Sequence, residues 1–256
     1  MINSLFAGGG ADTVVNLCQN AKISLTGPIQ FTAARQVLQT AGQPTAQGRA
    51  TLQLVSGGSS ALVYATGDNL EAVQLRSVIF DGNRCGLGRI VDGSSAIIEM
   101  GGNNHNQVVM HVKAFDPRGW SAFHAIEGYQ NYCSSMQIKN NHFGPAGHAP
   151  TGSAQFRKRH LVKLTKRQNG GQQYSPGEWA DGISLACKNS VVTNNYIEDA
   201  TDGGIVLFGA PGSTISGNRI ESLKETLLGG VNLVDVAPFG GDYSGVSIAN
   251  NVFSAS

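Results

Sequence analysis

The sequence predicts an all-β fold, a single-stranded right-handed parallel β-helix, from its glycine content, its repeated apolar strands and the short interval between the repeats. Gly accounts for 34 of the 256 residues, and charged residues for only 14%. Because strand-like apolar runs are too frequent for a disordered chain, we expect these glycines to serve turns in an ordered β protein. We expect one solenoid domain over residues 1–256.

One hexamer recurs along the chain, with an apolar residue at each end and Asn third from its end. Its copies are "IKNNHF" (138–143), "VTNNYI" (192–197), "ISGNRI" (215–220) and "IANNVF" (248–253), which place Asn141, Asn195, Asn218 and Asn251 in one register. Two upstream segments, "LRSVIF" (75–80) and "MHVKAF" (110–115), keep only the apolar ends. An Asn at a tight turn tolerates left-handed backbone geometry, and its amide can bond to the Asn above and below. We therefore expect a structural Asn ladder.

A second series of apolar segments lies between the hexamers. Its members are "SAFHAIEG" (121–128), "ADGISLAC" (180–187), "TDGGIVLF" (201–208) and "GGVNLVDV" (229–236). The closest units are about 21 to 23 residues apart, which is too short for a βαβ unit, and no helical period lies between them. Units stacked at ~4.8 Å per coil form parallel sheets and bury their apolar residues against the next coil. The predicted core of one coil is Ile183, Leu185, Val192 and Ile197.

The regular spacing breaks once, where two hexamers begin 54 residues apart, and an insertion of about residues 144–178 fills the gap. Six Lys and Arg residues fall between positions 157 and 167 of this insertion. Long excursions from a compact scaffold are often functional. The basic run is either a solvated edge face or the wall of a groove for an anionic ligand.

The two ends of the chain are less regular. The segment "PIQFTAARQVLQTAG" (28–42) fits either a short helix that caps the barrel or an extended strand with a loop. The last hexamer is followed by no capping pattern. Because an uncovered coil exposes unpaired backbone, we expect either a truncated C-terminal end or a partner there, including end-to-end contact between copies; the oligomeric state stays open.

The composition and net charge argue against some classes of binding partner. A net charge of +1 argues against general binding to nucleic acid or to a membrane surface, because both need a dominant basic field. No apolar run approaches the ~20 residues of a membrane span. The opening "MINSLFAGGG" lacks the features of a signal peptide, although Met1 would also begin a chain from which a signal had been removed.

Four cysteines, Cys18, Cys85, Cys133 and Cys187, show no C-x-x-C spacing. A zinc site and a tight disulfide framework are therefore not predicted, and buried free thiols are the expected state. Cys133 and Cys187 each lie five residues before the hexamer of their coil, so we expect them to stack.

Asp181 and Asp202 each precede a Gly at the entrance to an apolar strand, 21 residues apart. On consecutive coils, their Cα atoms are expected one strand spacing apart, ~5 Å. Carboxyl separations on the order of 5 to 9 Å suit the two glycosidase geometries, and the mutual repulsion would raise the pKa of one of them. The alternative is that each Asp only caps a turn, since Asp-Gly is an ordinary turn signal.

These segments carry a resemblance to a known group of proteins. The solenoid resembles the pectin-lyase-like β-helix superfamily, and residues 181–207 look like the polygalacturonase-type signature, Asn-Thr-Asp-Gly followed one coil later by Gln-Asp-Asp. Asp181 falls on the Asp of the first element and Asp202 on the first Asp of the second. Ala180 replaces the Thr, Gly203 replaces the second Asp, "LLGGVNLV" (227–234) stands where the family has Gly-His-Gly, and no Arg-Ile-Lys follows. The resemblance implies a secreted or extracellular carbohydrate-active β-helix with a reduced acid set.

Other side chains are candidates to complete a substrate-binding site. Trp179 and Trp120 precede equivalent strands and form either a sugar-stacking wall or part of the core. His124 is an acid or base if its side chain points outward, and a core residue if it points inward. The remaining candidates are Arg118, Glu178, His160, Lys163, Lys166 and Arg167, of which the basic ones would neutralise a uronate or, in a lyase, abstract its α proton.

No cofactor is expected for the main hypothesis. If the protein is instead a lyase, Asp199 and Asp202 are candidates to hold Ca²⁺, as carboxylates of lyases do. These two carboxylates fall short of the six to eight oxygen ligands that Ca²⁺ takes.

The sequence therefore predicts a β-helix that acts on a polysaccharide or oligosaccharide, by acid–base cleavage with Asp181 and Asp202 as the carboxylate pair. Two alternatives stay open. One is a lyase that forms an unsaturated uronide. The other is a non-catalytic glycan-binding or assembly module in which Asp181 and Asp202 only cap turns.

Overall fold

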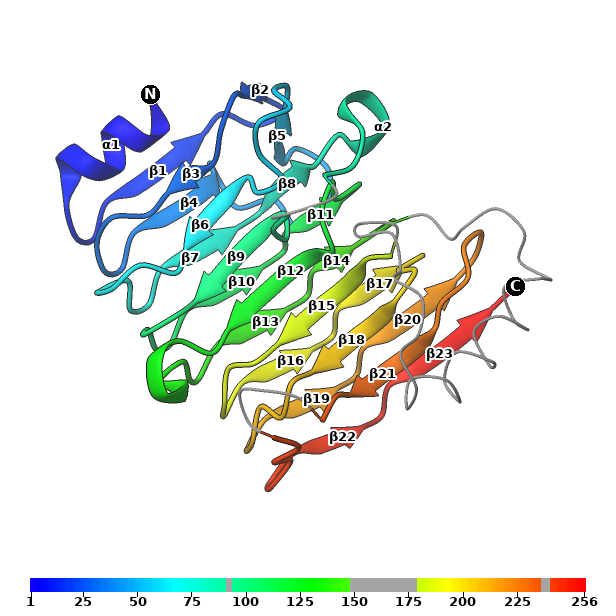
Figure 1. The fold of residues 1–256 in the computed structure, drawn as a ribbon. Helices are drawn as coiled ribbons and strands as arrows, with labels where there is room; N and C mark the ends of the chain where they lie inside the picture. Colours follow the sequence, from blue (N-terminus) through cyan, green and yellow to red (C-terminus); the bar gives the residue numbers. More distant parts are fainter. Residues whose placement is uncertain (91–93, 148–178, 236–239) are drawn as a thin grey trace.

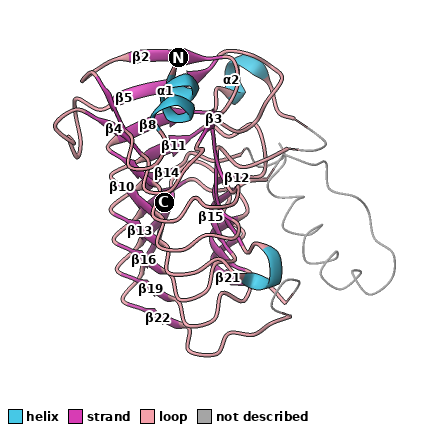
Figure 2. Cartoon of the chain, turned by 90° about the vertical axis from the view of Figure 1, so that its left-hand side faces the viewer, coloured by secondary structure: helices cyan, strands magenta, loops and turns pink. Residues whose placement is uncertain are grey.

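The computed structural model describes residues 1–90, 94–147, 179–235 and 240–256, and these residues form a solenoid of three parallel sheets (Figure 1). Each coil except the last described one contributes one strand to each sheet, so that strands three apart in the numbering are hydrogen-bonded neighbours. We name the sheets A, B and C. Figure 2 shows strands of sheet A along one side of the solenoid and strands of sheet C along the other.

The strands of each sheet stack in the order of the coils. Sheet A contains β1 (Val14–Leu17), β4 (Val37–Thr40), β7 (Gln74–Arg76), β10 (Val108–Met110), β13 (Gln137–Lys139), β16 (Val191–Thr193), β19 (Thr214–Ser216) and β22 (Ser247–Ala249). Sheet B contains β2 (Lys22–Leu25), β5 (Ala50–Leu54), β8 (Val78–Asp81), β11 (Lys113–Phe115), β14 (His142–Phe143), β17 (Tyr196–Glu198), β20 (Arg219–Ser222) and β23 (Val252–Ala255). Sheet C contains β3 (Ile29–Gln30), β6 (Val63–Ala65), β9 (Ile98–Gly101), β12 (Ser121–Ile126), β15 (Asp181–Leu185), β18 (Gly203–Leu207) and β21 (Gly229–Leu233). The helical segments are α1 (Ile2–Gly9), α2 (Arg84–Leu87) and the 3₁₀ turn η1 (Tyr129–Asn131).

The hydrophobic core fills the interior of the solenoid. Most strands of sheets A and B alternate buried and partly exposed residues, because successive side chains of a strand point to opposite faces. The predicted core residues are all fully buried: Ile183, Leu185, Val192 and Ile197. This confirms the all-β parallel β-helix that the two series of apolar segments predicted.

The Asn ladder is present at the turn between sheets A and B. Oδ1 of Asn195 accepts the backbone N–H of Asn141 at 3.0 Å, and its Nδ2 donates to Oδ1 of Asn218 at 2.9 Å. The ladder residues do not themselves take the left-handed conformation. The residue before each one does, which is Asn140, Asn194, Gly217 and Asn250. The ladder side chains are therefore free to point inward and bond along the solenoid.

A disulfide joins two coils and corrects the expected free thiols. Cys133 and Cys187 do stack at equivalent positions, and they are bonded to each other across 54 residues of sequence. Cys18 and Cys85 are free, and both are exposed rather than buried. The spacing predicted that the two cysteines stack, but free thiols were expected there, and the structure shows that the stacked sulfur atoms are bonded.

The N-terminal segment left open by the sequence is extended. It contains β3 and β4 joined by a loop, and the capping helix is α1 instead, which the sequence did not predict. The Phe6 side chain of α1 is fully buried, with its ring centroid 4.7 Å from that of Phe31. Burial of this aromatic pair anchors α1 over the first coil.

Candidate functional site

The outer face of sheet C carries a column of polar side chains. Strand pairing places Tyr64, Glu99, His124 and Ser184 at one level of successive coils, continued by Val206 and Asn232. The residues on either side of this level, such as Phe123 and Ala125, belong to the core. Side chains of the column therefore point away from the core, since neighbouring residues of a strand face opposite sides.

Asp181 lies at the start of β15 on the same outer face. Gly182 faces the interior, where an added Cβ would lie 2.6 Å from Cγ2 of Ile197. The Asp181 carboxylate instead accepts the Ser184 hydroxyl at 2.8 Å on Oδ2 and the backbone N–H of Gly203 at 2.9 Å on Oδ1. Asp181 and Ser184 therefore both lie on the side of sheet C that carries the polar column.

The predicted alignment of the two Asp-Gly pairs is wrong by one residue. Ile183 pairs with Ile205, which sets Gly182 opposite Gly204 and Asp181 opposite Gly203. Gly204, like Gly182, faces the core, where its added Cβ would meet Cγ2 of Ile220 at 2.7 Å. The inward glycines thus determine the register, and Asp202 lies one residue before the level of Asp181.

Asp181 and Asp202 are nonetheless electrostatically coupled. Burial and, second to it, the charge of Asp202 raise the pKa of Asp181 to about 7, against the lowering effect of its hydrogen bonds from Gly203 and Ser184. Asp202 is only partly buried, and its carbonyl accepts the backbone N–H of Leu228 at 3.0 Å. The outer face therefore holds a carboxyl group that is still half protonated near neutral pH, beside a second carboxyl group nearer to solvent.

His124 points outward, into this face. Its Nδ1 lies 2.7 Å from Oε2 of Glu99, and Oε1 of Glu99 accepts the backbone N–H of Ala96 at 2.7 Å. The Trp120 ring packs against the imidazole in a T-shaped arrangement, with centroids 4.7 Å apart. Within the described part of the chain, Nε2 of His124 has no hydrogen-bond partner. Glu99 thus fixes the ring through Nδ1, and this contact does not use Nε2.

The sequence alignment placed Trp120 and Trp179 at the same level of successive coils, but in the structure they lie at different levels. Asp181 pairs with Ser121, so the residue opposite Trp120 is Ala180. The Trp120 indole N–H donates to the carbonyl of Ser94 at 3.1 Å, and the side chain is partly exposed. Trp179 is 8% exposed. Trp120 is therefore the tryptophan placed beside His124.

Arg118 is buried and holds the loops around it together. Only 3% of it is exposed, and its guanidinium donates to the carbonyls of Gly88 and Ser59, both at 2.7 Å. Its position contradicts the prediction of a substrate-facing cation, because its donors hold neighbouring loops together. Five other predicted residues lie outside the described residues, together with the basic run: Glu178, His160, Lys163, Lys166 and Arg167.

Asp199, the other predicted calcium ligand, also has a structural contact. Its Oδ1 accepts the backbone N–H groups of Leu223 at 2.6 Å and Lys224 at 2.9 Å, and the residue is 2% exposed. This oxygen therefore holds the turn that follows β20. In the part of the chain that the structure describes, no group of three or more His, Cys, Asp or Glu side chains is placed to hold a metal ion.

Sequence reasoning missed Glu99, Ser121 and Ser184 as parts of this site. Ser184 is fully buried, and its hydroxyl lies 3.0 Å from that of Ser121. Extending the repeat upstream by one coil would have aligned "IIEM" (97–100) with the strand that contains His124. The signal there is weak because that part of the chain has no hexamer Asn.

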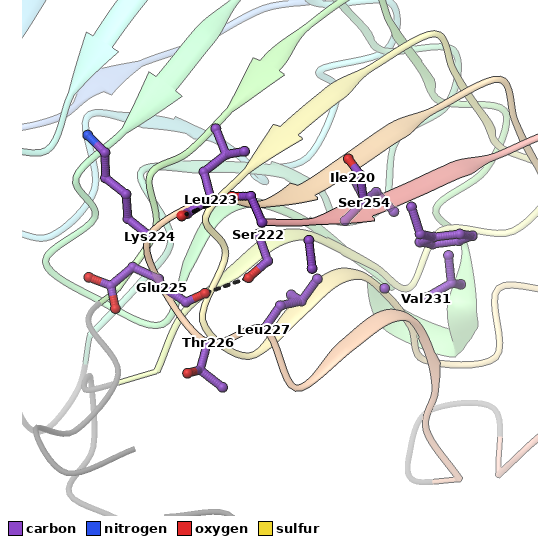
Figure 3. Close-up of a pocket in the computed structure, with 13 residues that line it drawn as sticks. Ile220, Ser222, Leu223, Lys224, Glu225, Thr226, Leu227, Val231 and Ser254 are labelled. Atoms are coloured by element: carbon purple, nitrogen blue, oxygen red, sulfur yellow. Dashed lines mark hydrogen bonds between the residues drawn. The ribbon is translucent and has the colours of Figure 1, made fainter. Parts of the chain in front are cut away.

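A pocket of about 820 Å³ lies at the last coils (Figure 3). Its walls include Ile220, Val231 and Phe253 from three strands, and Figure 3 shows Ser222 directed toward the carbonyl of Glu225. None of the predicted site residues lines it. We therefore locate the candidate site on the outer face of sheet C.

Comparisons with known proteins agree with the architecture. A family model described as "Right handed beta helix region" matches residues 178–256, which supports the predicted hand of the solenoid. No curated protein matches the sequence.

No helix among the described residues is both long and apolar enough to cross a membrane.

Two solved structures are similar to the chain. One is the Dettilon tailspike protein, at 11% identity and a TM-score of 0.42, with 86% of this chain and 38% of that chain covered. The other is an alginate lyase from Paenibacillus sp. str. FPU-7, at 13% identity and a TM-score of 0.48, with 98% of this chain and 92% of that chain covered. The chain thus spans well under half the length of the tailspike chain.

Proposed function

We propose that the protein cleaves glycosidic bonds of a polysaccharide on the outer face of sheet C, with Asp181 as the proton donor and Asp202 as its partner carboxylate. The observation that carries this proposal is the environment of Asp181. A general acid must hold its proton near the working pH, and burial beside Asp202 raises the pKa of Asp181 to about 7. Most glycoside hydrolases use two carboxyl groups, one as a proton donor and one as a base or nucleophile, and unlike environments let the two groups differ in protonation.

Each group has a distinct task in this scheme. Asp181 gives its proton to the glycosidic oxygen as the bond from that oxygen to the anomeric carbon breaks. Asp202, which is closer to solvent, stabilises the positive charge that develops on the sugar ring and assists the attack of water. The hydrogen bond from Ser184 orients the Asp181 carboxyl group, and Trp120 supplies an aromatic ring beside the same face.

A panel of soluble polysaccharides, both neutral and acidic, tests the proposal by the appearance of new reducing ends. The variants Asp181→Asn and Asp202→Asn are expected to lose turnover by a factor of about 10² to 10⁴. Asp68→Asn makes the same chemical change at an exposed turn and is the matched control. Unchanged turnover in both site variants, with the fold retained by circular dichroism, would reject the assignment.

One observation favours a second candidate, a lyase that acts on a uronate. Nε2 of the His124 ring, which Glu99 holds through Nδ1, suits a base that removes the proton next to a carboxylate. The product would then carry an unsaturated end, detected by ultraviolet absorbance, on alginate or pectate. Loss of that product in His124→Gln, with Asp202→Asn unaffected, would favour the lyase over the hydrolase.

A further inference from the structure

The outer face of sheet A carries basic side chains and no acidic ones. None of the eight strands of sheet A contains Asp or Glu, whereas strands of sheets B and C contain residues such as Glu198 and Glu99. Arg76 ends β7 and Lys139 ends β13, and strand pairing places both at the level of Met110, the last residue of β10 between them (Figure 1). An anion on this face therefore meets no carboxylate of the same sheet.

The basic side chains point away from the core. The residues that precede this level in β7, β10 and β13 all belong to the core, and they are Leu75, Val109 and Ile138. Because successive residues of a strand face opposite sides, the side chains of Arg76 and Lys139 lie on the outer face. Both residues are partly exposed, so a ligand in solution can reach them.

Arg76 and Lys139 belong to two equivalent units, each a Gln followed two residues later by a cation. Nε of Arg76 donates to Oε1 of Gln74 at 2.6 Å, and Nζ of Lys139 donates to Oε1 of Gln137 at 3.0 Å. Both acceptors are neutral amide oxygens, so these hydrogen bonds do not neutralise the cations. The units lie two coil steps apart, which places the Cα atoms of the two cations about 10 Å from each other.

An apolar step separates the two units. Val108 and Met110 occupy the matching positions of β10, the first between the two Gln residues and the second between the two cations. Both are partly exposed. A sugar ring has apolar C–H faces and polar edges, so it can lie on this step while carboxylates on either side of it reach the two units.

Further cations extend the positive charge toward sheet B. Arg49, which directly precedes β5, donates from Nη1 to the carbonyl of His111 at 3.0 Å, and Lys113 begins β11. Burial, followed by the charges of Arg49 and Arg76, lowers the pKa of His111, which shows that both guanidinium groups approach this ring. Four successive coils thus carry one of the cations Arg49, Arg76, Lys113 and Lys139 each. Among the described residues, none of these four forms an ion pair.

We propose that the outer face of sheet A, from β7 to β13, binds an acidic polysaccharide, with polymer carboxylates at the two Gln and cation units and a sugar ring over Val108 and Met110. One coil step is close to the length of one sugar residue, so the two units engage sugars on either side of that ring. The site holds the polymer by charge-assisted hydrogen bonds and does no chemistry on it. It is therefore independent of the cleavage proposed for sheet C.

Other anionic macromolecules fit this face less well. The strands of sheet A contain no aromatic residue on which the bases of a single-stranded nucleic acid would stack. The strands β7, β10 and β13 are paired on both sides, so they offer no strand edge to an acidic peptide. A polysaccharide needs neither feature, because its carboxylates and hydroxyl groups bind through hydrogen bonds to side chains.

Isothermal titration calorimetry with polygalacturonate and alginate measures the binding, in the wild type and in Asp181→Asn, which removes the cleavage proposed for sheet C. We expect both proteins to bind an acidic polymer, with an affinity that falls as the salt concentration rises. Arg76→Gln and Lys139→Gln should each weaken this binding about threefold, and their combination about tenfold. Lys224→Gln, the same change at an exposed position after β20, is the matched control and should bind like the wild type.

Carbodiimide coupling locates the polymer, because it joins a carboxylate to a lysine amine that lies beside it. With an oligogalacturonate, mass spectrometry should find Lys139 coupled several-fold more than Lys224, and Arg76→Gln should reduce the coupling at Lys139. Equal coupling at the two lysines would place the polymer elsewhere and overturn the proposal.

Two further results would also overturn it. One is an affinity for both acidic polymers that is absent at low salt or unchanged in the combined variant. The other is single-stranded DNA that binds more tightly than either polymer and displaces it, because the face would then serve a nucleic acid. Turnover and binding are separate readouts, so a wild type that binds the polymers and cleaves none would reject only the function proposed for sheet C.

Discussion

The carboxylate of Asp181 accepts the backbone N–H of Gly203 at 2.9 Å, because the ladder between β15 and β18 sets these two residues side by side. Gly203 has no side chain to occupy the outer face at this level. The consequence is a carboxyl group that is enclosed, hydrogen-bonded and 6% exposed, on a face that carries the rest of the candidate site.

The raised pKa of Asp181 predicts a specific pH dependence of stability. Its ordinary value of 3.8 rises to about 7 in the folded protein, so between these pH values the folded state binds a proton that the unfolded state has lost. The free energy of unfolding should therefore fall as pH rises from about 4 to about 7, by about 4 kcal/mol from this group.

Asp181→Asn should remove this fall, because an amide does not titrate in that range. Urea unfolding at pH 4 and pH 8 measures it, as the change in the free energy of unfolding between the two conditions. Asp68→Asn should follow the wild type at both. Parallel behaviour of the wild type and Asp181→Asn would show that the carboxyl group ionises freely in the fold.

Gly203→Ala should be destabilising by about 1 to 3 kcal/mol, because the added Cβ overpacks the outer face. It would lie 2.9 Å from Nδ2 of Asn232, 3.3 Å from Oδ1 of Asp181, and closer still to Cγ2 of Val206. Gly58→Ala is the control, since an added Cβ there meets nothing within 4 Å. Thermal unfolding of both variants checks this, and equal midpoints would mean that the outer face has room for a methyl group.

Asn195→Ala should cost about 3 kcal/mol or more of folding free energy. The Asn195 amide bonds to Asn141, to the carbonyl of Ile138 and to Asn218, and the residue is 1% exposed. Removing it leaves several buried polar groups without partners. Asn251→Ala, at a partly buried position of the same ladder, should cost less, and chemical denaturation of the two variants compares them. A reversed order would contradict the burial argument.

Breaking the disulfide should lower stability by about 4 kcal/mol in the chain-entropy model, because Cys133 and Cys187 close a loop across 54 residues. The paired variant Cys133→Ser with Cys187→Ser, compared with the wild type without reductant, measures this by denaturant unfolding. Replacing the exposed Cys18 and Cys85 with Ser should have little effect. If reductant destabilises the wild type and the paired variant equally, the effect does not arise from this bond.

The strand and ladder pattern could be predicted from the sequence because it depends on spacing. An apolar residue that must face the interior on every coil produces a repeat, and the repeat located the Asn ladder, the strands of sheet C and the stacked cysteines.

The sequence by itself determined that this chain winds into a parallel β-helix, since the periodic burial of apolar side chains allows few other folds. Only the tertiary structure decided the register of Asp181, because the requirement for glycine at the two inward positions, Gly182 and Gly204, outweighs the likeness of the two Asp-Gly pairs. It also decided that the side chains of His124 and Glu99 meet, because the upstream coil that contains Glu99 has no hexamer Asn to mark it, and that the stacked Cys133 and Cys187 are bonded rather than free.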